Sequence, residues 1–269
     1  MIYSKKSNFK EYFKYQNPVR HFFTALEFLT IIPTPSWFKR RAKLKADFSV
    51  EIAESTPFFP FVGFIIGVLL FLIYLIFNRF PCEITSVLVL GGWICITGAL
   101  HLDGLADTID GLSGGNTREK VLDIMRDSHI GAKGVAGVIL LILLKLFLLA
   151  HILSYSKPFA LVYIPSVSRW GMVIGAFIIP YAREEGLGKF SLFIGYPQII
   201  MATLITLILG IIILGILHLI LIAGVGTTTV IFSLYLKKKI GGFTGDTLGA
   251  LGEIGEVVSL FLVSLLYLT

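Results

Sequence analysis

The feature that most limits the fold of this chain is a series of apolar stretches, each about as long as a membrane is thick. A helix needs about 20 mostly apolar residues to cross the hydrocarbon core, and several stretches of the sequence meet that requirement. They are residues 57–78, 84–102, 134–154, 158–180, 197–216, 218–236 and 253–268. The chain is 55% hydrophobic and only 15% charged, with a mean hydropathy of +0.85, which is too apolar for a water-soluble domain. We therefore expect an all-α, polytopic membrane bundle of about seven transmembrane helices.

Two further expectations concern how these stretches are organised. The segment 197–236 is long enough for about two crossings, which predicts a helical hairpin that turns near Leu217. Residues 1–56 precede the first span, and Phe22, Leu26 and Leu29 follow a helical spacing that is typical of a helix lying in the interface. Because no repeat or linker divides the chain, we expect 1–269 to form a single integral membrane domain, with 57–269 as the transmembrane bundle.

The positions of the cations predict the orientation. If the N-terminus lies in the cytoplasm, the basic segments 39–45, 118–126, 183–189 and 237–239 all fall on the inner side. The net charge of +6 then reflects topology and anionic lipid, so we expect no nucleic-acid partner. We expect a multi-pass protein of the cytoplasmic (inner) membrane. Its polar loops are then 103–133, 181–196 and 237–252, and they meet at the cytoplasmic face.

Acidic residues are concentrated in one window, because six of the 17 in the chain lie between residues 101 and 127. They form two runs with helical spacing: Asp103, Asp107 and Asp110, then Glu119, Asp123 and Asp127. Crowded carboxylates repel one another unless a cation neutralises them, and oxygen ligands select Mg²⁺, Mn²⁺ or Ca²⁺ over zinc. The alternative is a solvated loop, but ionisable groups beside a bilayer favour a functional site.

The residue pattern ranks these acids as metal ligands. Asp103 and Asp107 are the first candidates, Asp123 is the next, and Asp110 is a weaker one. Asp127, at the end of the second run, is either a ligand or a general base.

Three cations are candidates for holding phosphate. Arg126 and Lys133 flank the start of the 134–154 span, where helix N–H groups also point outward. Ordinary inner-side charges are the alternative interpretation of these two residues. Arg169 lies mid-span, where a cation needs a partner, so it pairs with the acids or with a substrate phosphate, or else reaches the interface.

A glycine-rich loop on the same predicted face is a further candidate site. Residues 241–249 read GGFTGDTLG, which is typical of a backbone cradle for phosphate or nucleotide, and a simple turn is the alternative. Within it, Thr244 and Asp246 are predicted to bind substrate or phosphate.

Carboxylates that hold metal ions at a membrane surface suit phosphoryl-type transfer. Two enzyme classes use this chemistry, prenyl transferases and CDP-alcohol phosphotransferases. The sequence departs from the CDP-alcohol motif, because Leu100 stands where that motif has its first acid. A cation transporter is a third alternative, but its acids would lie at mid-span and not on one face.

Six segments together resemble those of one known family: FLTIIP (28–33), HLDGLADTIDG (101–111), RE (118–119), IMRDS (124–128), YAREEGLG (181–188) and GFTGDTLG (242–249). The family is cobalamin synthase, also called adenosylcobinamide-GDP ribazoletransferase, and the segments span almost the full length. The resemblance implies an Mg²⁺-dependent enzyme of adenosylcobalamin biosynthesis. Such an enzyme joins adenosylcobinamide-GDP to α-ribazole or α-ribazole 5′-phosphate and releases GMP in the nucleotide-loop assembly step.

The resemblance also implies roles for the acids. A ribazole ribose hydroxyl attacks the cobinamide-side phosphorus, and Mg²⁺ on Asp103, Asp107 and Asp123 stabilises the departing GMP. Asp127 or Asp110 takes the hydroxyl proton.

Phosphates or guanine are then held by Arg126, Lys133 and the 242–249 loop. The implied partners are the two substrates and membrane lipid, and a homo-oligomeric assembly is compatible with the pattern.

Overall fold

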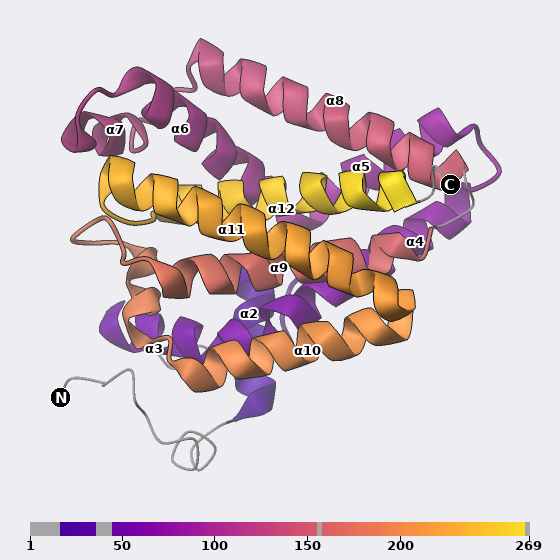
Figure 1. Cartoon of the computed structure of the whole chain (residues 1–269), viewed down its shortest axis with the longest axis horizontal. Helices are drawn as coiled ribbons and strands as arrows, with labels where there is room; N and C mark the ends of the chain where they lie inside the picture. Colours follow the sequence, from indigo (N-terminus) through magenta and orange to yellow (C-terminus); the bar gives the residue numbers. More distant parts are fainter. Residues whose placement is uncertain (1–16, 36–44, 155–157, 267–269) are drawn as a thin grey trace.

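The structure is a computed structural model that describes residues 17–35, 45–154 and 158–266. This part of the chain is almost entirely helical, and its one β-type contact is an isolated bridge between Tyr181 and Phe243. The helices α8 to α12 run side by side along the long axis of the molecule (Figure 1). The prediction of an all-α membrane bundle is confirmed. Most of the basic segment 39–45 lies outside the described residues.

The helices have the following bounds: α2 Pro18–Leu29, α3 Lys45–Ser55, α4 Phe59–Phe77, α5 Cys82–Thr97, α6 Leu100–Gly114, α7 Arg118–Ile124, α8 Ala132–Ser154, α9 Ala160–Ile178, α10 Tyr196–Leu214, α11 His218–Ile240 and α12 Gly245–Leu266. Short 3₁₀ helices cover Thr56–Phe58, Leu187–Phe193 and Gly215–Leu217.

Several of these helices can cross a membrane. Five helical stretches are long and apolar enough, and the bent pair α5 and α6 would make six. One of the five, Tyr196–Ile240, is 45 residues long, and the turn at Gly215–Leu217 folds it into the antiparallel helices α10 and α11 (Figure 1). The predicted hairpin is therefore confirmed, and about seven crossings agree with the structure.

Helix α9 lies at the centre of the bundle, and 83% of its most apolar stretch is buried inside the protein. It packs against α4, α10, α11 and α12. The contact with α4 is close because two glycines of α4 face α9. A Cβ added at Gly63 would clash with the carbonyl oxygen of Pro165, and one added at Gly67 would clash with that of Val162. Small residues at such positions let two membrane helices approach backbone to backbone.

Two predicted span boundaries are wrong, and both errors concern the acidic region. The expected span 84–102 is broken by consecutive left-handed residues, Gly98 (φ 61°) and Ala99 (φ 57°), and α6 leaves α5 at an angle of 86°. The last helix was expected to begin at residue 253, but α12 begins at Gly245. Its first turns are helical because they pack on α6, where a Cβ at Gly249 would lie 3.2 Å from the Cα of His101. We take α5 as the crossing helix and the acidic part of α6 as lying beyond the bend.

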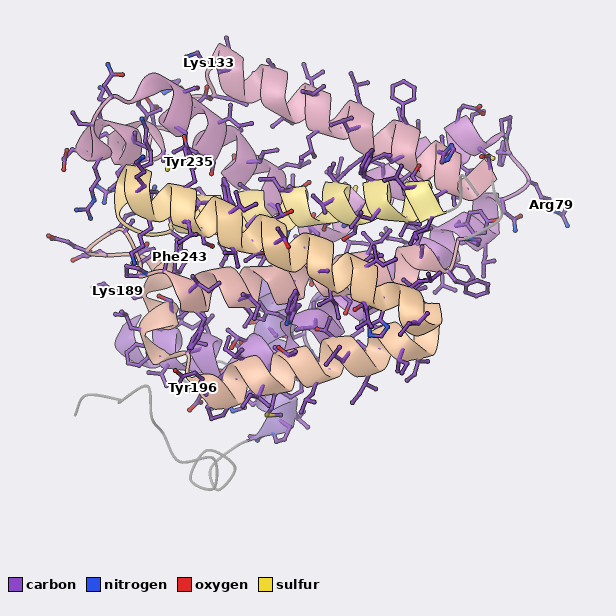
Figure 2. All side chains as sticks on the ribbon, in the orientation of Figure 1. Arg79, Lys133, Lys189, Tyr196, Tyr235 and Phe243 are labelled. Atoms are coloured by element: carbon purple, nitrogen blue, oxygen red, sulfur yellow. The ribbon has the colours of Figure 1, made fainter. Side chains whose placement is uncertain are left out.

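The two ends of the bundle differ in charge. Figure 2 shows Lys133 and Lys189 at one end and Arg79 at the opposite end. The helix α7, the start of α8 and the end of α11 with its three lysines all lie at the end that carries Lys133 and Lys189 (Figure 1). The acidic window and the loops predicted to converge with it are therefore at one end of the molecule.

Candidate functional site

The candidate site is built where α6 crosses the first turns of α12. Asp103 and Asp107 are about one helical turn apart on α6, and Asp246 stands in the first turn of α12. The two backbones nearly touch at Gly104, where an added Cβ would lie 2.7 Å from the carbonyl oxygen of Asp246. A side chain at that position would push the helices apart. The glycine thus lets acids from distant parts of the sequence come together.

The loop after α9 is tied to the start of α12 and brings a cation with it. The Phe243 N–H donates to the Pro180 carbonyl at 2.9 Å, and the Ala182 N–H donates to the Phe243 carbonyl at 2.8 Å. Arg183 follows directly and donates from Nη2 to Oδ2 of Asp246 at 2.8 Å. The 181–188 turn therefore contributes a guanidinium group to the cluster of acids.

Carboxylates outnumber cations in this part of the site. Burial, together with the nearby carboxylates of Asp103 and Asp246, raises the pKa of the Asp107 carboxyl to about 6. The Arg183 guanidinium lowers the pKa of Asp107, but by less than the sum of the raising effects. An added cation would relieve this repulsion.

Thr244 has a structural role at the start of α12. It is fully buried and caps α12, because the Thr247 N–H donates to its hydroxyl at 3.2 Å and its own N–H donates to the Thr247 hydroxyl at 2.8 Å. Its hydroxyl also donates to Asp246 Oδ2 at 3.2 Å. Thr244 therefore orients Asp246.

A cavity of about 280 Å³ opens beside these acids. The charged or ionisable side chains in its wall are His101, Asp103, Arg183 and Asp246. The apolar side chains are Phe28, Leu100, Met172, Phe190 and Leu248. Tyr181 and the glycines of the 181–188 turn also line it. We call this cavity the cleft.

The second acidic run does not form the single helical face that was predicted. Helix α7 ends at Ile124, so Glu119 and Asp123 share a helix but Asp127 lies beyond it. Asp127 is exposed to solvent and accepts from both the N–H and Nδ1 of His129, at 3.0 and 2.7 Å. These hydrogen bonds hold the pKa of the Asp127 carboxyl below its usual value. Asp123 is also exposed.

Asp110 has a structural partner for each oxygen. Oδ2 accepts from the Gly131 N–H at 2.7 Å, and Oδ1 accepts from the Gly134 N–H at 2.8 Å. The carboxylate therefore caps the N-terminus of α8, where negative charge is favoured. Lys133 adds a second link, because its Nζ donates to the Ser113 carbonyl at 2.7 Å. Of the residues predicted to hold phosphate, Lys133 and Arg126 are both exposed at this end.

Arg169 lies inside the bundle and is paired there. It is fully buried and forms an ion pair with Glu256. Lys145 pairs with the same carboxylate and with Glu253 at 2.5 Å, and it also lies 4.8 Å from the centroid of the Trp93 ring. Arg169 thus has a carboxylate partner, as a mid-span cation requires, but that partner is Glu256 and not an acid of the 101–127 window.

The donor chemistry of the cleft fits a hard divalent cation. Across the described residues, no three His, Cys, Asp or Glu side chains are grouped closely enough to hold a metal ion by themselves. Mg²⁺ usually takes one or two carboxylates and completes its shell with water and substrate phosphates. Asp103, Asp107 and Asp246 supply carboxylate oxygens of that kind, and burial together with their mutual repulsion raises the pKa of Asp107.

Sequence reasoning missed four contributors to the cleft. Arg183 was predicted only as part of an inner-side basic segment, and no local pattern indicates that it reaches Asp246. His101 opens the acidic motif and lines the cleft, where its Nδ1 lies 3.4 Å from Nη2 of Arg169. Phe28 and Phe190 come from α2 and from Leu187–Phe193, and only the fold brings them together.

Comparison with known proteins finds matches over most of the chain. Residues 21–264 match the family described as cobalamin-5-phosphate synthase. The chain is 39% identical over 239 residues to the adenosylcobinamide-GDP ribazoletransferase of Acetivibrio thermocellus, covering 87% of this chain and 93% of the relative. The enzymes of the same name from Geotalea daltonii and Clostridioides difficile are 36% and 33% identical, covering 90% and 92% of this chain and 96% and 98% of the relatives.

No solved structure matches the chain. The family match covers most of the sequence, and its relatives are enzymes of the nucleotide-loop assembly step of cobalamin synthesis. The chain belongs to the cobalamin-5-phosphate synthase family and is an enzyme of that step.

Proposed function

We propose that this enzyme is an Mg²⁺-dependent transferase that joins adenosylcobinamide-GDP to α-ribazole or α-ribazole 5′-phosphate and releases GMP. The observation that carries the proposal is that the close contact of α6 with the start of α12 gathers Asp103, Asp107 and Asp246 beside a single guanidinium group, that of Arg183. The names of the relatives supply the substrate class. A diphosphate substrate brings more negative charge, so a divalent cation is needed to bind it beside these acids.

The reaction exchanges one phosphorus–oxygen bond for another. The ribose hydroxyl oxygen of ribazole forms a bond to the phosphorus on the cobinamide side of the diphosphate. The bond between that phosphorus and the bridging oxygen breaks, and GMP leaves with the bridging oxygen. The proton of the hydroxyl group passes to a carboxylate of the enzyme.

Carboxylates drawn from Asp103, Asp107 and Asp246 are the groups that would hold Mg²⁺, one or two at a time, with water and substrate phosphates completing its shell. Asp123, exposed on α7, would approach the ion only once substrate is bound. When bound, the ion supplies charge neutralisation of the diphosphate and of the departing phosphate. Arg183 stands beside Asp246 and is placed to hold a phosphate oxygen, because a guanidinium group binds phosphate well. Arg126 and Lys133, exposed at the same end, attract the anionic substrate.

For the proton acceptor, the structure favours Asp127 over Asp110. Both oxygens of Asp110 already accept backbone N–H groups of α8, so a proton on that carboxyl would break a helix cap. Asp127 is exposed and held by His129, and its lowered pKa keeps it ionised near neutral pH. Asp127→Asn should therefore lower turnover, whereas Asp110→Asn should lower stability.

We further propose that the protein lies in the cytoplasmic (inner) membrane with the cleft facing the cytoplasm. The end that carries the cleft also carries Lys133, Lys189 and the three lysines at the end of α11. Lys and Arg are enriched on the cytoplasmic side of membrane proteins. The nucleotide substrates would then reach the cleft from the cytoplasm.

A product assay tests the function. Purified protein in lipid, supplied with adenosylcobinamide-GDP, α-ribazole and Mg²⁺, should release GMP, and Asp103→Asn should abolish that release. Glu83→Gln, an exposed acid in the first turn of α5, is the matched control and should keep wild-type turnover. Release of diphosphate or CMP from other donors would indicate a prenyl- or CDP-alcohol-type enzyme, and ion flux without GMP would indicate a transporter. Near-normal turnover of folded Asp103→Asn would contradict the metal-ligand assignment.

A further inference from the structure

The wall of the cleft is made of two chemically different groups of side chains. The charged group comes from α6, α12 and the loop after α9, and it contains Asp103, Asp246 and Arg183. The apolar group contains Phe28 from α2 and Phe190, together with Met172 from α9. A ligand that fills this space must therefore present both a polar part and an apolar part.

The apolar group is a fixed aromatic surface. The rings of Phe28 and Phe190 meet edge to face at 5.8 Å. Phe28 is stacked on Phe59 at 5.6 Å, and Phe190 meets Phe243 at 6.4 Å. Phe190 and Phe59 are almost completely buried, whereas Phe28 is half-buried. This surface is held in place by its own packing and is ready for a flat apolar ring.

Size limits which ligand can enter. The cleft has a volume of about 280 Å³, near the lower limit of roughly 300–1,000 Å³ for pockets that hold small-molecule ligands. A nucleoside fits a space of that size, but a corrin ring with its side chains does not. The corrinoid must stay outside and present only its diphosphate to the carboxylates.

The two substrates would bring two different bases to the site, guanine and benzimidazole, and these bases differ in polarity. Guanine carries several donors and acceptors on its edge, and a buried edge without partners would cost binding free energy. Phe28, Met172 and Phe190 offer no strong hydrogen-bonding group. A benzimidazole ring has two fused apolar edges and little hydrogen-bonding capacity, and a methionine sulfur packs well against an aromatic ring.

We propose that the aromatic surface of the cleft, formed by Phe28, Phe190 and Met172, binds the benzimidazole ring of the ribazole substrate, with its ribose directed to Asp103 and Asp246. The assignment rests on the function proposed above. It makes Phe28 a specificity-determining residue for the lower base. The fused apolar ring displaces water from the aromatic surface, and the reacting hydroxyl reaches the carboxylates.

Steady-state kinetics with both substrates varied tests the assignment. Phe28→Ala should raise KM for α-ribazole by about 3- to 10-fold, the value of one aromatic contact, and leave KM for adenosylcobinamide-GDP within about 2-fold. Phe28→Trp should restore most of the affinity, because it keeps a flat ring. Phe80→Ala, an exposed phenylalanine in the turn before α5, is the matched control and should change neither KM.

A substrate series makes the test independent of folding. With wild-type enzyme, a ribazole that carries a hydroxyl group on the fused ring should bind more weakly than α-ribazole, and Phe28→Leu should reduce that preference. If Phe28→Ala raises KM for adenosylcobinamide-GDP and not for α-ribazole, the surface binds guanine and the proposal is wrong. Equal KM values for folded Phe28 variants and wild type would also overturn it. Absence of GMP release by the wild-type enzyme would instead contradict the proposed function itself.

Discussion

The molecule contains two clusters of charged side chains that differ in balance and in access to solvent. In the interior, Lys145 and Arg169 are matched by Glu253 and Glu256, and all four side chains are buried. In the cleft, the acids are partly exposed and their repulsion is only partly offset by Arg183. In the interior cluster the positive and negative charges are equal in number, whereas in the cleft the carboxylates outnumber the single guanidinium group.

This difference separates a structural role from a ligand-binding role. A buried cation in a membrane protein needs a carboxylate partner, and once both charges are paired nothing further is required. Carboxylates left without cations are strained by mutual repulsion and are relieved when a cation binds. The charge balance of a cluster, more than its number of acids, therefore indicates whether it receives a ligand.

The largest effect that we expect concerns the balanced cluster. Glu256→Gln leaves Arg169 buried without a carboxylate, which should lower the free energy of unfolding by about 3–5 kcal/mol. Unfolding in detergent, measured by thermal or denaturant titration, checks this value. The double variant Arg169→Met with Glu256→Met should recover part of the loss, because no buried charge is then unpaired. Glu185→Gln, in an exposed turn, is the control, and equal stability of Glu256→Gln and wild type would refute the distinction.

The unbalanced cluster should behave in the opposite way. Asp107→Asn should reduce GMP release by about 100- to 1,000-fold, the usual cost of removing one electrostatic group from a transfer site. Its stability should equal or exceed that of wild type, because one repelling charge is gone. Turnover and unfolding measured on the same preparation check both expectations. A variant that keeps its turnover, or that loses stability as Glu256→Gln does, would contradict the comparison.

A third prediction concerns how the cleft is held together. Gly104→Ala places a Cβ 2.7 Å from the Asp246 carbonyl oxygen, so α6 and α12 must move apart. We expect a loss of about 1–3 kcal/mol in stability together with reduced GMP release. Gly91→Ala is the matched control in α5, since a Cβ there meets nothing within 4 Å. If both variants behave alike, the close approach of α6 and α12 does not matter for the site.

The smallest effect is a dependence of stability on pH. The pKa of Asp107 is about 6 in the folded protein, above its usual value of 3.8, so between these two pH values the folded state holds a proton that the unfolded state has lost. Without divalent cations, the contribution of this group to stability should fall as the pH rises from about 4 to about 7. Melting temperatures of wild type and Asp107→Asn across this range measure this contribution. Mg²⁺ should reduce the pH dependence in wild type, and an identical pH dependence in both proteins would show that Asp107 does not cause it.

The apolar pattern of the sequence was enough to predict the bundle. Backbone groups in lipid must be satisfied within each helix, so the long apolar stretches near 57–78, 134–154 and 158–180 became α4, α8 and α9 with small shifts at their ends. The break at Gly98 could not be foreseen in the same way. Its left-handed neighbour is an alanine, and alanine gives no turn signal.

The site was predicted in part for a related reason. Helical spacing placed Asp103 and Asp107 on one face of α6, because that relation is local. The nearness of Asp246 and Arg183 depends on how α12 and the loop after α9 pack, which no local pattern encodes. The cap that Asp110 provides for α8 likewise depends on the position of another helix.

The order of helices along the chain has a consequence for biosynthesis. The cleft takes Phe28 from near the start of the described chain and Asp246 from its last helix. During translation, the earlier helices enter the membrane while the acids of α6 still lack Asp246. A ribosome that stalls before α12 therefore leaves a product with an unfinished cleft, and the arrival of this helix is the event that turns an inserted protein into a competent enzyme.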